Sequence, residues 1–128
     1  MTEPYARHLA DTIRETAFAA HRFLRHGHIE KIYENALRNR LQRLSLKIAQ
    51  QHPINVFDED GSLLGEFYAD LLVNDEFIIE LKAVRALHDD HTAQVLGYLR
   101  TSRLEHAMLI NFGAPKIEVR KFIFRNQD

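Results

Sequence analysis

The sequence predicts an α/β fold in which two helices precede three strands, a third helix and two more strands. Apolar residues recur every three or four positions up to residue 44, and short apolar or alternating runs begin at residue 46. A helical pattern returns at 89–102, between two such runs. Because the chain shows neither internal repeats nor a linker, we expect one domain spanning residues 1–128.

The composition favours a soluble, cytoplasmic protein. Among the 128 residues, 45% are hydrophobic and 27% charged, with neither a membrane-length apolar run nor a secretory leader. The absence of cysteine excludes disulfides and thiolate metal ligands. A net charge of −1 argues against a broadly basic surface that coats nucleic acid, so a polyanionic partner would need metal ions or clustered Lys and Arg.

Two amphipathic helices are predicted before residue 45. The first spans about 4–25, and Gly27 is expected to end it. The second spans about 29–44, with an apolar stripe of Tyr33, Leu37, Leu41 and Leu44. Glu30 lies in its first turn, where the helix dipole favours a carboxylate, and this is the simplest explanation for that residue.

The strands follow. Residues 46–57 resemble an edge strand, because Pro53 cannot donate a ladder hydrogen bond. Segments 63–73 and 77–84 are predicted to form a hairpin.

A third helix and two strands complete the prediction. Asp89 or Asp90 is expected to cap the helix that runs to about residue 102. Residues 106–111 are predicted as a short buried strand and 117–124 as an alternating one.

Charged residues end the apolar strand that begins at Phe77. Glu80 and Lys82 share one face of this strand, and burying such groups is unfavourable unless each finds a partner or a metal ion.

The length of the preceding loop decides which residue faces Glu80. A two-residue loop pairing Val73 with Glu76 would send Asp70 to the other face of the sheet. A three-residue loop pairing Val73 with Phe77 would set Asp70 across from Glu80. We favour the second register, because it gathers the polar side chains into one site.

Two facing carboxylates repel, and the usual remedies are a raised pKa or a divalent cation. Oxygen ligands favour Mg²⁺ or Mn²⁺ over zinc. Lys82 could then orient a metal-bound water or stabilise charge on a phosphate, which makes a workable phosphodiester-hydrolysis site. The alternative is an ordinary cross-strand ion pair with Lys82, which a short Asp…Glu-x-Lys pattern more often represents.

Two helical pairs add to this pattern. Glu30 and Tyr33 share one helical face, as do Gln94 and Tyr98. Each pair alone is weak, since the tyrosines could be core aromatics and Gln94 a solvated helix residue.

As a set, these residues resemble the Gly-x-x-Glu-x-x-Tyr family, a bacterial branch of the PD-(D/E)XK nuclease superfamily. The resemblance extends from about residue 23 to 124, through segments 27–34, 68–73, 79–84, 94–99 and 109–113. It implies a restriction-endonuclease-like core, a mixed central sheet flanked by helices in the order ααβββαββ. This order agrees with the one predicted from periodicity.

The resemblance also implies roles. Asp70 matches the first acid, although Ala69 replaces the proline before it, and Glu80 with Lys82 matches the (D/E)-x-K pair. Glu30 matches the helix acid that often completes the metal site. The implied cofactor is Mg²⁺, for which Mn²⁺ is expected to substitute, held by Glu30, Asp70, Glu80 and the Leu81 carbonyl.

The remaining roles concern the substrate. Gln94 and Tyr98 resemble a helix motif of RecB-type nuclease domains that contacts metal, water or DNA, and Tyr33 is expected to bind the substrate as well. The resemblance thus implies a nuclease that binds DNA rather than RNA, with a homodimer as a possible assembly. The alternatives are a non-catalytic module that binds nucleic acid or protein, and a structural metal or ion-pair centre beside a protein interface.

Overall fold

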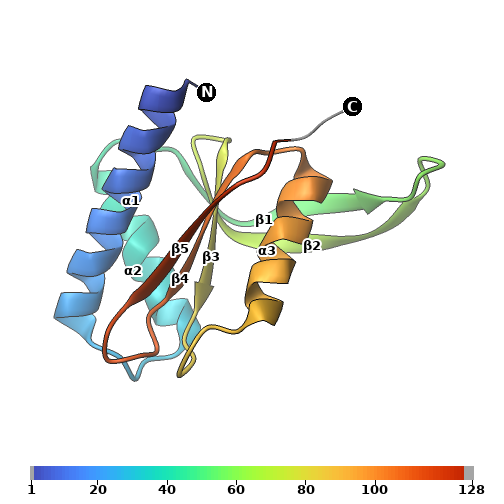
Figure 1. Cartoon of the computed structure of the whole chain (residues 1–128). Helices are drawn as coiled ribbons and strands as arrows, with labels where there is room; N and C mark the ends of the chain where they lie inside the picture. The colour runs from blue at the N-terminus through green and yellow to red at the C-terminus, as the bar shows by residue number, and fades with distance from the viewer. Residues whose placement is uncertain (1, 126–128) are drawn as a thin grey trace.

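The computed structural model describes residues 2–125 and confirms the predicted order of elements (Figure 1). The elements are α1 (Glu3–Leu24), α2 (Glu30–Arg43), β1 (Ile48–Phe57), β2 (Leu63–Val73), β3 (Phe77–Lys82), α3 (Asp89–Ser102), β4 (His106–Asn111) and β5 (Glu118–Ile123). None of the helices in this range is long and apolar enough to cross a membrane.

The strands form one mixed sheet in the order β1-β2-β3-β4-β5. Only β3 and β4 run parallel, and α3 makes the crossover between them that parallel neighbours require. β1 lies at an edge, as Pro53 predicted. Figure 1 shows α1 and α2 on one face of the sheet and α3 on the other.

Each face of the sheet has its own apolar core. Ile79 and Leu81 pack with residues of α1 and α2, whereas Ile78 packs with Val95 and Leu99 of α3. Alternate residues of β3 therefore contribute to opposite cores, which explains its continuous apolar run.

The predicted helix boundaries need three corrections. α1 ends at Leu24 with Arg25 as its C-cap, and Gly27 lies in the following loop at a φ of +115°. Leu44 is 54% exposed instead of lying on the buried stripe, because α2 ends one residue earlier.

The third correction concerns the start of α3. Its N-cap is His88 rather than Asp89 or Asp90, and the His88 backbone N–H donates to His91 Nδ1 at 3.1 Å. The two aspartates occupy the first turn instead, where the helix dipole favours them.

The end of β4 fixes the loop that follows β3. Asn111 Oδ1 accepts hydrogen bonds from the Val84 and Gly113 N–H groups, both at 3.0 Å. A Cβ on Gly113 would lie 2.3 Å from the Val84 nitrogen, so only glycine permits this approach. The packing thereby fixes the chain just beyond Lys82.

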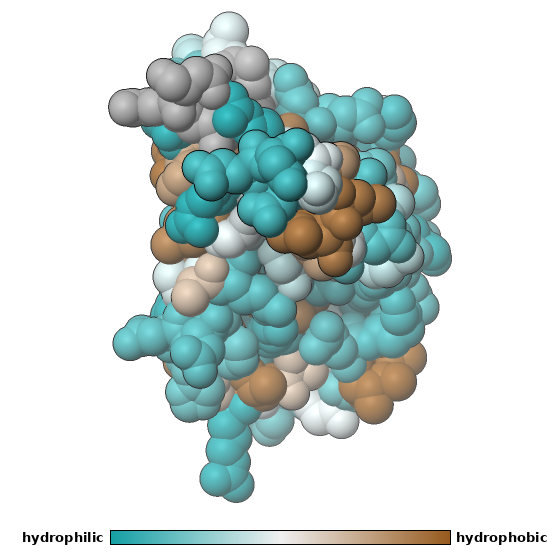
Figure 2. All heavy atoms as spheres, turned by 90° about the vertical axis from the view of Figure 1, so that its right-hand side faces the viewer, coloured by the Kyte–Doolittle hydropathy of each residue, from teal (hydrophilic) through white to brown (hydrophobic). Residues whose placement is uncertain are grey.

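The β1–β2 hairpin extends past the rest of the sheet (Figure 1). Three large apolar residues near its tip are exposed: Phe57, Leu63 and Leu64. Figure 2, which views the molecule from this side, shows apolar side chains gathered among hydrophilic ones.

Candidate functional site

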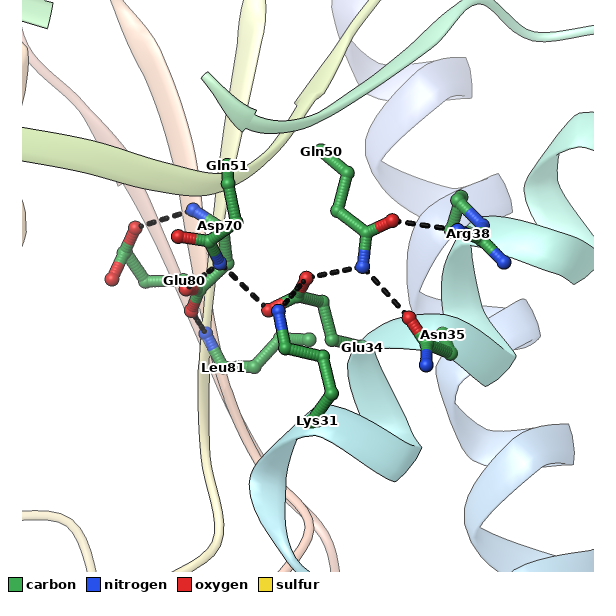
Figure 3. Close-up of polar contacts among 9 residues, drawn as sticks. All are labelled: Lys31, Glu34, Asn35, Arg38, Gln50, Gln51, Asp70, Glu80 and Leu81. Carbon is green, nitrogen blue, oxygen red and sulfur yellow. Dashed lines mark hydrogen bonds and ion pairs between the residues drawn. The ribbon is translucent and has the colours of Figure 1, made fainter. Parts of the chain in front are cut away.

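The polar site begins where the β2–β3 ladder stops. The register pairs Val73 with Phe77, as predicted, and ends one pair short of Asp70 and Glu80. Beyond that point, hydrogen bonds from backbone N–H groups to these two side chains take the place of the backbone ladder. Glu80 Oε1 accepts a hydrogen bond from the Asp70 N–H at 3.0 Å, and Asp70 Oδ2 accepts one from the Leu81 N–H at 2.8 Å (Figure 3).

This reciprocal bonding buries two carboxylates together. Asp70 is 8% exposed and Glu80 is 4% exposed. Burial raises the pKa of Asp70, and burial together with the Asp70 charge raises the pKa of Glu80 to about 8. The Lys82 charge opposes both shifts without cancelling them. The site therefore favours an added proton or cation.

The structure also brings Lys82, Gln94 and Tyr98 to this end of the sheet. Lys82 Nζ donates to Gln94 Oε1 at 3.3 Å, which joins β3 to the exposed face of α3. The Tyr98 ring stacks on Phe67 with centroids 3.7 Å apart. Burial and the nearby charge of Glu80 raise the pKa of Tyr98 to about 12, so its hydroxyl remains a hydrogen-bond donor.

Glu30 lies exposed at the first position of α2. Partial desolvation raises its pKa, and the Asp70 charge adds to that shift. Glu30 is thus electrostatically coupled to the acid pair. As the first residue of α2, it lies on the helix side of the site.

Tyr33 lies in the core, as its place on the apolar stripe predicted, and not in the substrate-facing position that the resemblance implied. It is fully buried and stacks on Phe112 with centroids 4.7 Å apart. Its hydroxyl donates to the Arg25 carbonyl at 2.5 Å and accepts from the His28 N–H at 3.1 Å. These bonds hold the loop before Glu30. The burial corrects the expected substrate contact, since Tyr33 has no exposed surface with which to make one.

Glu34 is a buried acid that the sequence reasoning missed. It is 2% exposed, one helical turn after Glu30. Its carboxylate accepts from Lys31 Nζ at 2.8 Å, from Gln51 Nε2 at 2.8 Å and from Gln50 Nε2 (Figure 3). No local pattern signalled its burial, because the amides that hold it come from β1.

Gln51 connects this helix acid to the strand acid. Its Nε2 donates to Glu34 Oε1 and also to Asp70 Oδ1, the latter at 3.1 Å. The β1–β2 pairing continues on both sides of Gln51 and Asp70 but skips this pair, and Gln51 has a φ of +51°. Simple strand alternation carried no signal of this arrangement.

The donor chemistry suits a hard divalent cation, because the side chains at Asp70 and Glu80 offer buried oxygen ligands with uncompensated charge. Within residues 2–125, no group of three or more His, Asp or Glu side chains is already drawn together as a metal site. The expected convergence of Glu30 with the acid pair is therefore not preformed.

Comparison with known proteins supports this picture. A family model described as the PD-(D/E)XK nuclease superfamily matches residues 7–122, from α1 into β5. No curated protein matches the sequence. Members of the matched superfamily are generally nucleases, which bind nucleic acid and usually use divalent metal ions. With most of its length matched, the chain belongs to the PD-(D/E)XK nuclease superfamily.

Proposed function

We propose that this chain is a magnesium-dependent nuclease that hydrolyses phosphodiester bonds, in DNA rather than RNA, and acts as a single domain. The observation that carries the proposal is the buried Asp70–Glu80 pair with Lys82 beside it on β3. The motif Gly27-x-x-Glu30-x-x-Tyr33 further supports assignment to the Gly-x-x-Glu-x-x-Tyr branch. A homodimer would allow two such sites to act on the two strands of a duplex.

The ligands proposed for the cation are the carboxylates of Glu30, Asp70 and Glu80 with the Leu81 carbonyl. When bound, Mg²⁺ or Mn²⁺ lowers the pKa of water and stabilises negative charge on phosphate. Asp70 and Glu80 are each fixed by a hydrogen bond to the other's strand, so holding a cation would cost them little side-chain entropy.

Lys82 is proposed to orient the attacking water and stabilise charge on the phosphate. Its bond to Gln94 ties the ammonium to α3, and Gln94, which is exposed, can in turn contact the substrate strand. Tyr98 remains protonated near the two carboxylates and can donate to a phosphate oxygen. We assign Tyr33 a positioning role, because its hydroxyl holds the loop before Glu30.

The test is cleavage of single-stranded, double-stranded and branched DNA, and of RNA, with Mg²⁺ or Mn²⁺. Lys82→Ala and Asp70→Asn should each reduce cleavage by about 100-fold or more, as removal of a charge-stabilising group does. The matched controls are Lys47→Ala and Asp75→Asn, which alter an exposed ion pair of the same residue types. These controls should cleave at the wild-type rate.

A non-catalytic binding module is the second candidate, favoured by the fact that Glu30 is not drawn in to the acid pair within the described residues. It predicts salt-sensitive nucleic-acid binding without turnover. A structural metal centre instead predicts a higher melting temperature with metal and neither cleavage nor binding. Wild-type protein that cuts none of the substrates, or a Lys82→Ala variant that cuts as well as wild type, would rule out the nuclease proposal.

A further inference from the structure

We propose that Gln51 acts as a latch on the proposed metal site. Glu34 holds the side-chain amide of Gln51, and this amide must release Asp70 before the cation takes its place. This inference rests on the proposed function, because the cation is the one assigned there to Asp70 and Glu80. The latch consists of the Gln51 Nε2 group and its two carboxylate partners. One amide nitrogen thus lies within hydrogen-bonding distance of acids from α2 and β2, at 2.8 and 3.1 Å.

The latch covers the oxygen of Asp70 that the backbone leaves open. Asp70 Oδ2 accepts from the Leu81 N–H, whereas Oδ1 accepts from Gln51 Nε2. A cation and an N–H group cannot occupy the same position on that oxygen, because both are positive toward it. Metal binding along the lone-pair direction of Oδ1 that Gln51 fills therefore requires the amide to move away.

The backbone of β1 is shaped to place this amide. Gln51 has a φ of +51°, a region that residues other than glycine adopt rarely and at an energetic cost. The pairing of β1 with β2 is interrupted at the same residue, opposite Asp70. The strand thus departs from regular geometry at a position that contacts both acids.

The other contacts allow the latch to open without disturbing the acids. When Gln51 leaves, Glu34 keeps its bonds to Lys31 and Gln50, and Asp70 keeps its bond to the Leu81 N–H. Gln51 itself is exposed, so its side chain can turn into solvent. Release of the amide is then a local rearrangement of one side chain.

The first test measures the affinity for Mg²⁺ and Mn²⁺ by calorimetry, without substrate. Gln51→Met keeps the length of the side chain and removes its donor, so binding should become about five-fold tighter or more, since no charge-assisted bond has to break first. Gln50→Met is the matched control. Gln50 donates to Glu34 and Asn35 but makes no bond to Asp70, so its loss should leave affinity equal or weaker.

The second measurement uses wild-type protein alone, so it decides the matter even if Gln51→Met does not fold. Nuclear magnetic resonance of the side-chain amides, assigned through selective labelling, should show the Gln51 NH₂ signal shift and lose protection from exchange on Mg²⁺ addition. The Gln50 signal should keep its protection.

The outcomes separate the latch from the proposed function. Tighter binding by Gln51→Met, or a shifted Gln51 signal where that variant does not fold, supports the latch. Unchanged or weaker binding, or a Gln51 signal that Mg²⁺ leaves in place, overturns it even when wild-type cleavage depends on Lys82. If wild-type protein binds neither metal, the latch and the metal-dependent nuclease both fail.

Discussion

Two groups of buried acids meet at this site, and they are compensated in different ways. Asp70 and Glu80 accept hydrogen bonds mainly from backbone N–H groups of the neighbouring strand. Glu34 is equally buried but accepts from an ammonium and two side-chain amides. Backbone dipoles leave the strand pair with excess negative charge, whereas Lys31 supplies Glu34 with a full positive charge.

The difference teaches which acids are available for chemistry. A carboxylate already matched by a cation contributes to stability, whereas a buried pair whose raised pKa values the Lys82 charge does not cancel retains affinity for a further cation. We therefore regard Glu34 as the structural anchor of α2 against β1. Asp70 and Glu80 are the part of the same polar network that we propose for metal binding.

Removing the helix acid is the largest change that this comparison predicts. Glu34→Ala should lower the free energy of unfolding by about 3 kcal/mol, because Lys31, Gln50 and Gln51 lose a buried acceptor. Glu30→Ala is the control and should change it by less than about 0.5 kcal/mol, since Glu30 is exposed. Urea denaturation of the metal-free proteins measures both. Equal effects of the two variants would show that Glu34 is no anchor.

The buried Asp70–Glu80 pair should make the stability of the metal-free protein depend on pH. The folded-state pKa of Glu80, about 8, lies above its ordinary value of 4.5. Its contribution to stability is therefore fully present below about pH 4.5 and is lost as the pH rises through about 8.

Metal-free protein should thus be less stable at about pH 8.5 than at about pH 5.5, by at least about 1.4 kcal/mol, the equivalent of one pKa unit. Glu80→Gln mimics the protonated acid and should flatten this dependence. The carboxyls of Asp70 and Glu30 and the ammonium of Lys82 also act on Glu80, and both proteins keep these groups. The difference between the two pH profiles therefore reports on the Glu80 carboxyl. Denaturation curves at several pH values measure the effect. Parallel pH profiles for wild type and Glu80→Gln would contradict it.

The strand pair could be found from sequence, and the helix side could not. Alternation along the hairpin left two loop lengths open, and the register chosen because it gathers the polar side chains is the one that places Asp70 opposite Glu80. Gln51 escapes such reasoning, since its left-handed backbone breaks the alternation that the prediction relies on. Glu34 was missed because its burial depends on partners from β1, 16 and 17 residues away in the chain.

Tyr33 shows the same limit in another form. Its place on the apolar stripe predicted its burial correctly, but its stacking partner Phe112 comes from the other end of the chain. Local spacing identifies which residues share a face. It does not decide which distant residue a buried face meets.

The smallest predicted effect tests whether the tyrosine on α2 is structural. Tyr33→Phe should lower the free energy of unfolding by about 1 kcal/mol, because the Arg25 carbonyl and His28 N–H lose their partner while the Phe112 contact is kept. Tyr68→Phe is the matched control, since that hydroxyl bonds Glu66 on an exposed surface, and it should cost less than about 0.5 kcal/mol. Thermal denaturation measures stability, and cleavage assays give KM for the substrate. A large rise in KM for Tyr33→Phe with unchanged stability would instead support the substrate contact that burial argues against. The helix side of the site would then take part in the chemistry, as the strand side is proposed to do.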